Sequence, residues 1–214
     1  MKESTLCRIC GKRRPKRACP AVGGDICPIC CGTEREISLS CPLDCEFLRM
    51  GHRHEKPVPI AENQLAYPEV DVTEEFLLDQ EELLLFCAYS LLQAALHTPG
   101  AIDTDVIAAL QALIQTRRTQ ESGLFYETRP ENNSIAAGVQ RSFTASLEAY
   151  EKLREEREGP ASVRNSDLLK ILVFLLRIGE QNQNGRPRGR MFVDLLQQMT
   201  PARSVEERVP SIIL

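Results

Sequence analysis

Eight of the nine cysteines lie within the first 54 residues, and six of them form closely spaced pairs. The pairs are Cys7-x2-Cys10, Cys27-x2-Cys30 and Cys41-x3-Cys45, and His52 and His54 follow them. A Cys-x2-Cys pair presents two zinc ligands from one tight turn. A segment with so few apolar residues needs a metal to fold, so the sequence predicts a structural zinc module over residues 1–54.

The redox setting decides between metal ligands and disulfides. Met1–Thr5 lacks the apolar stretch of a secretory signal. The longest apolar runs, Leu83–Tyr89 and Ile171–Leu176, are well short of the roughly 20 residues that span a bilayer. We therefore expect a cytoplasmic protein with no membrane partner, and reduced cysteines that bind metal.

The spacing around the pairs indicates local structure. Gly11, directly after the first pair, can take the positive φ that such a turn needs. Glu34–Ser40 alternates polar and apolar residues, which is typical of a short strand or hairpin. A helix capped by Cys41 would place Cys41, Cys45 and His52 on one face. Turn, hairpin and helix in this order predict a treble-clef arrangement.

These motifs resemble the binuclear zinc modules of the HIT and MYND type. The resemblance implies interleaved ligands, with Cys7, Cys10, Cys41 and Cys45 around one zinc. The second zinc would bind Cys27, Cys30 and His52, with Cys19, Cys31 or His54 completing the site. The resemblance also implies a role in protein–protein interaction.

A second pairing fits the spacing as well. Cys7-x2-Cys10-x16-Cys27-x2-Cys30 has the spacing of a zinc ribbon, and Cys19, Cys31, Cys41 and Cys45 would then form the other site. Both pairings predict two zinc ions. Because cysteine-rich sites are closed, with no open coordination position, we expect the zinc to be structural rather than catalytic.

The rest of the chain predicts an all-α bundle. Residues 55–72 contain three prolines and indicate a linker, and residues 201–214 indicate a C-terminal tail. Between them, apolar periodicity, caps and breakers predict about five helices in residues 73–200. The expected helices cover about 74–97, 104–121, 130–158, 167–181 and 190–199. The fold class is thus mainly α, and the whole chain is similar to uncharacterised bacterial proteins with a cysteine-rich head.

No nucleotide-binding, protease or hydrolase motif occurs, so we do not expect an enzyme. Residues 1–60 contain 11 Lys and Arg against 7 Asp and Glu, but thiolates bound to two zinc ions would lower their net charge to about +1. We therefore favour a zinc-binding scaffold or adaptor with a protein partner, able to form homo-oligomers through the helical domain. The alternatives are a nucleic-acid regulator using Lys12–Arg17, with Arg186–Arg190 as a second basic loop, and an enzyme with a site in the helical domain.

Overall fold

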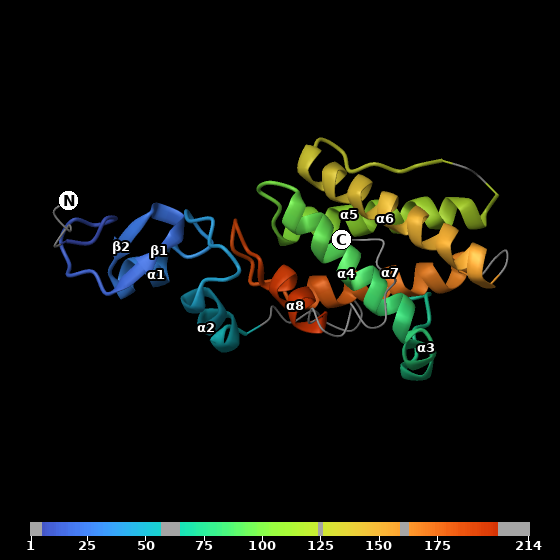
Figure 1. Cartoon of the computed structure of the whole chain (residues 1–214), viewed down its shortest axis with the longest axis horizontal. Helices are drawn as coiled ribbons and strands as arrows, with labels where there is room; N and C mark the ends of the chain where they lie inside the picture. The colour runs from blue at the N-terminus through green and yellow to red at the C-terminus, as the bar shows by residue number, and fades with distance from the viewer. Residues whose placement is uncertain (1–5, 57–64, 124–125, 159–162, 201–214) are drawn as a thin grey trace.

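The computed structural model describes residues 6–56, 65–123, 126–158 and 163–200. A small cysteine-rich head (residues 6–56) lies at one end of an elongated molecule, and a helical bundle (residues 65–200) forms the rest (Figure 1). The expected fold class, mainly α with a small N-terminal module, is confirmed at this level. The predicted tail over 201–214 and residues 57–64 of the predicted linker lie outside the described residues.

The head is built on one short hairpin. Strands β1 (Arg17–Cys19) and β2 (Gly24–Ile26) pair antiparallel, and a single 3₁₀ turn, η1 (Pro20–Val22), connects them. Gly23 closes this turn at φ +58°, a conformation that glycine adopts without strain. Helix α1 (Pro28–Glu34) follows directly, with Cys27 at its N-cap.

The segment 34–40 differs from its prediction. It forms a turn with one isolated bridge between Arg35 and Leu39 instead of a strand. The alternation was misleading because Glu36 is fully buried and has φ +53°, a conformation that a regular strand does not contain. Helix α2 (Glu46–His54) also begins later than Cys41, because the chain turns once more where the Cys45 N–H donates to the Pro42 carbonyl at 3.1 Å.

The bundle has six helices in its described residues, where five were expected. They are α3 (Glu74–Asp79), α4 (Glu81–His97), α5 (Asp103–Glu121), α6 (Ser134–Glu158), α7 (Asn165–Gln181) and α8 (Met191–Met199). Thr73 caps α3 as predicted, since its Oγ1 accepts from the Phe76 N–H at 3.1 Å. The extra helix arises because the chain breaks at Gln80, between α3 and α4. The third expected helix begins at Ser134 rather than near Pro130, where the Asn133 side chain accepts from the Ala136 N–H.

Helix α4 occupies the centre of the bundle and packs against α6, α7 and α8 (Figure 1). Phe86, Ala88 and Leu91 on this helix are fully buried, as its nearly uniform apolar character predicts. A Cβ added to Gly179 on α7 would lie only 2.8 Å from the Phe192 ring, so glycine lets α8 approach closely. Within the described ranges, no helix combines the length and apolar character needed to cross a membrane.

The loop between α7 and α8, residues 182–190, reaches from the bundle to the head (Figure 1). The Arg188 N–H donates to the Glu36 carbonyl at 2.8 Å, and the Arg190 N–H donates to Glu36 Oε1 at 2.7 Å. The Asn184 amide donates to the other Glu36 oxygen at 2.8 Å. Arg186 adds a bond to the Arg35 carbonyl at 2.7 Å. Glu36 is therefore the point at which this loop holds the head.

A buried charge network completes this junction. Both ring nitrogens of His52 on α2 contact carboxylates: Nδ1 lies 2.9 Å from Asp194 Oδ2, and Nε2 lies 3.1 Å from both Glu36 oxygens. Burial favours the neutral ring, but the two carboxylates outweigh it and raise the pKa of His52 to about 9. Burial likewise opposes ionisation of Glu36, but hydrogen bonds and charge from His52 lower its pKa overall. The junction thus consists of one imidazolium between two carboxylates.

Replacing the central carboxylate should weaken the fold. Glu36→Gln keeps the volume but removes the charge and turns an amide N–H group toward a network that consists largely of donors. Breaking a buried pair by removing one partner costs about 3–5 kcal/mol. We expect the free energy of unfolding, from urea titrations followed by circular dichroism, to fall by about 3 kcal/mol. The matched control Glu131→Gln, at an exposed residue, should change it by less than about 0.5 kcal/mol; an equal effect of both variants would contradict the role given to Glu36.

The same network should make stability fall in alkali. The pKa of His52 is about 9 in the fold and 6.5 ordinarily, so its contribution is complete below pH 6.5 and is lost as pH rises through 9. The difference in unfolding free energy between the wild type and His52→Gln isolates this group from the cysteines. We expect that difference to shrink by up to about 3 kcal/mol between pH 6.5 and 9.5. A constant difference across this range would show that His52 is neutral in the fold.

Candidate metal centre

The two Cys-x2-Cys turns meet because the β1–β2 hairpin returns the chain to its start. The Arg8 N–H donates to the Asp25 carbonyl at 3.0 Å, and the Lys16 N–H donates to the Ile26 carbonyl at 3.0 Å. These bonds place the turn that begins at Cys7 beside the start of α1. Gly11 ends the first turn at φ +62°, as predicted, and its N–H donates to the Cys7 carbonyl at 2.8 Å.

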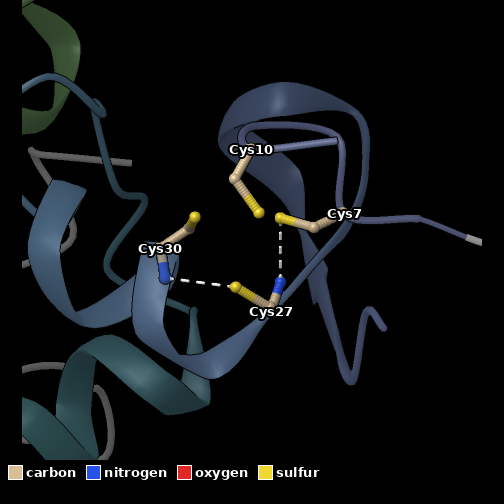
Figure 2. A group of neighbouring side chains, drawn as sticks. All are labelled: Cys7, Cys10, Cys27 and Cys30. Carbon is tan, nitrogen blue, oxygen red and sulfur yellow. Dashed lines mark hydrogen bonds between the residues drawn. The ribbon is translucent and has the colours of Figure 1, made fainter. Parts of the chain in front are cut away.

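Four sulfur atoms converge between these turns. The Sγ atoms of Cys7, Cys10, Cys27 and Cys30 all lie within 4.8 Å of one another (Figure 2). A zinc ion about 2.3 Å from each of four sulfurs in a tetrahedron needs the sulfurs about 3.8 Å apart. No pair of these sulfurs exceeds this separation by more than about 1 Å, so side-chain movements of that size would complete the coordination sphere. These four cysteines are therefore a candidate zinc site.

Backbone N–H groups point at the sulfurs and favour thiolates. The Cys27 N–H donates to Cys7 Sγ at 3.2 Å, and the Cys30 N–H donates to Cys27 Sγ at 3.4 Å (Figure 2). Burial opposes ionisation of Cys7, but N–H donors from Cys10, Cys27 and Ile9 lower its pKa to about 6. Similar donors at residues 12 and 13 lower the pKa of Cys10.

The fourth thiol behaves differently. Burial, followed by contact with the neighbouring sulfurs, raises the pKa of Cys30 to about 12. A dication among the sulfurs would reverse this, because ligating thiols lose their protons to the metal. Arg13 provides further positive charge: its side chain hydrogen-bonds to Cys27, which raises the pKa of the guanidinium. The site is thus arranged to stabilise negative charge that a zinc ion would share.

The structure brings together the four cysteines of one site in one of the two predicted pairings. It combines the two Cys-x2-Cys turns, which is the ribbon-type pairing, and not the interleaved pairing that the HIT and MYND resemblance implied. Among the described residues, no second group of three or more such ligands gathers within the same distance. One possible site for one zinc ion is therefore shown, and a second site is not.

The remaining predicted ligands lie elsewhere. His52 does not join Cys27 and Cys30, because its two ring nitrogens contact Asp194 and Glu36. His54 is exposed at the end of α2. The last four candidates are Cys19 at the end of β1, Cys31 on α1, buried Cys41, and Cys45 at the N-cap of α2.

Two contributors to the head were not found in the sequence. Arg13 belongs to the basic run Lys12–Arg17 and is exposed, but no local pattern predicted that its side chain contacts Cys27. The Glu36–His52–Asp194 network had no local signal, because His52 and Asp194 are 142 residues apart. Comparisons with protein-family models, with curated proteins and with solved structures find no match to this chain.

Removing one of the four sulfurs should remove one metal ion. We expect Cys27→Ser to lose about one zinc per chain relative to the wild type, measured by elemental analysis of purified protein. Cys87→Ala is the matched control, because Cys87 is fully buried in α4 and should leave the zinc content unchanged. Unchanged zinc in Cys27→Ser would show that these sulfurs do not hold the ion.

Proposed function

We propose that the protein is a zinc-binding protein whose metal is structural and whose head acts as a protein–protein interaction module. The site supports the structural role because four sulfurs would occupy all four coordination positions of a tetrahedral zinc ion. No position would then remain for substrate or water. Zinc at this site would fix the two turns relative to each other. A rigid surface that projects from the bundle then results (Figure 1).

The observation that carries the interaction role is the exposed apolar surface of the head. Five large hydrophobic side chains are exposed on this small unit, and exposed apolar surface is typical of protein–protein interaction sites. They are Leu6, Ile9, Ile29, Ile37 and Met50, with exposed fractions from 37% to 54%. Ile9 and Ile29 each lie between the two cysteines of a turn, so zinc binding would present both outward.

Charge on the same turns indicates the chemistry of the partner. Arg8, Lys12, Arg14 and Lys16 are exposed around Ile9. A protein segment that combines apolar side chains with Asp or Glu would complement both features. We therefore propose an acidic, partly apolar segment of a partner protein as the ligand of the head. The helical bundle would provide a second surface or a homo-oligomer interface.

Contacts within the molecule weigh against nucleic acid as the ligand. Within Lys12–Arg17, Arg13 contacts Cys27, and the Arg17 guanidinium lies 4.5 Å from the centroid of the Phe47 ring. In the second basic loop, Arg186 pairs with Glu55 at 2.7 Å and Arg188 donates to Ser40 at 2.7 Å. These four arginines have internal partners, so the exposed charge of the first basic loop that remains for phosphates is limited to Lys12, Arg14 and Lys16.

The experiment uses the zinc-loaded full chain and fluorescein-labelled peptides that alternate Leu or Phe with Asp and Glu. We expect measurable binding by anisotropy and at least a tenfold loss in Ile9→Asp and in Ile29→Asp. Leu78→Asp on α3, at a residue 70% exposed, is the matched control and should bind normally. Zinc content is measured in each variant, so that a folding defect is recognised.

Labelled single-stranded DNA and duplex RNA are tested in parallel at 50 and 200 mM salt. Tighter binding of either nucleic acid than of every peptide, with a steep loss at higher salt, would overturn the proposed partner class. Equal peptide binding by the wild type and both isoleucine variants would overturn the proposed surface.

A further inference from the structure

Four cysteines of the head remain outside the first cluster, and none of them forms a disulfide. Cys31 and Cys41 are each only 8% exposed, and Cys19 and Cys45 are half-buried. Cys19 lies on β1, Cys31 lies on α1, and Cys45 is the N-cap of α2. Cys41 lies in the turn before α2.

Cys19 and Cys31 lie on the same side of the hairpin. Helix α1 contacts β1, and Cys19 packs against the small buried cluster that contains Cys31, Ile26 and cysteines of the first site. Adjacent residues on a helix project about 100° apart. Cys30 faces the first cluster, so Cys31 projects away from it around the axis of α1.

Helix α2 packs onto this side of the hairpin. Phe47, two residues after Cys45, packs against the cluster that contains Cys31, and the Arg17 guanidinium lies over its ring. Alternate residues of a strand share a face, so Cys19 and Arg17 lie on the same face of β1. The start of α2, with Cys45, therefore lies beside the end of β1, with Cys19.

Cys41 joins Cys45 through the short turn in which the Cys45 N–H donates to the Pro42 carbonyl. Burial raises the pKa of the Cys41 thiol, a hydrogen bond from the Glu36 backbone N–H lowers it, and negative charge on Glu36, Cys45 and Cys19 raises it. Cys45 and Cys19 therefore lie within electrostatic range of Cys41.

We propose that Cys19, Cys31, Cys41 and Cys45 bind a second zinc ion, next to the first. No three of these sulfurs lie within 4.8 Å of one another in the structure. Closing the site would require side-chain rotations, and rotation about χ1 moves a cysteine sulfur by about 3 Å. The inference rests on the proposal that the head binds zinc, but its ligands are entirely distinct from those of the first site.

This site would have a mechanical role that the first lacks. The first cluster joins only the hairpin and α1. Cys41 and the partly buried Cys45 pack with the large apolar core of the bundle, whereas Cys19 and Cys31 pack with the small core of the head. A zinc ion among these four would therefore link the two cores, close to the segment that carries Glu36.

The test compares metal content and cobalt spectra of the full chain. We expect about two ions per wild-type chain and about one in Cys41→Ser and in Cys19→Ser. Cys27→Ser should also keep about one ion, the double variant Cys27→Ser/Cys41→Ser should keep almost none, and Cys87→Ala should keep both. Co²⁺ in each single variant should give the intense sulfur charge-transfer bands of tetrathiolate coordination, which shows that the remaining site is intact.

The outcomes separate the two proposals. One ion in the wild type, retained by Cys41→Ser and Cys19→Ser but lost by Cys27→Ser, would overturn the second site and leave the first in place. Two ions in the wild type that both persist in Cys41→Ser and Cys19→Ser would also overturn it. A wild-type chain that binds no metal would overturn the zinc function as a whole.

Discussion

The fold of the head depends on holding four sulfur atoms together at the crossing of two chain turns. Its small core consists largely of the cysteines themselves, with Ile26 as the one fully buried aliphatic residue among them. Two strands of three residues cannot be stable alone in water. Metal–sulfur bonds would replace the apolar burial that the segment lacks, and they would do so at the position where the hairpin and α1 meet.

The bundle follows ordinary packing, and the junction between the two parts is the unusual feature. Proteins seldom bury two carboxylates around one imidazolium, because desolvation of each charge is costly. Here the cost is offset by hydrogen bonds from the backbone of Arg190 and the side chain of Asn184 to Glu36. Such a network has strict geometric requirements, so it favours one orientation of the head over others that apolar contact alone would permit.

Local signals in the sequence predicted what local chemistry determines. The Cys-x2-Cys turns, the positive φ of Gly11 and the Thr73 cap all depend on neighbouring residues, and all three are confirmed. Apolar periodicity likewise predicted the helical bundle. The break at Gln80 was missed because no proline or glycine marks it.

Which cysteines pair could not be predicted uniquely, because the answer depends on how the 16 residues between the two turns fold. The ribbon-type spacing was recognised as one of two solutions, and the hairpin within those residues selects it. The burial of Glu36 was beyond reach for a different reason. Its partners Asn184 and Arg190 lie about 150 residues away, and a single acidic residue in the sequence gives no sign of such contacts.

The long separation between His52 and Asp194 has a consequence for synthesis on the ribosome. At about 5–20 residues per second, the 142 residues between them take roughly 7 to 30 seconds to translate. For most of that interval the nascent head has left the exit tunnel, whereas the residues that it docks against are not yet made. Metal binding at that stage would allow the head to fold before the bundle is complete. His52 and Glu36 would then be exposed to water until α8 packs against them.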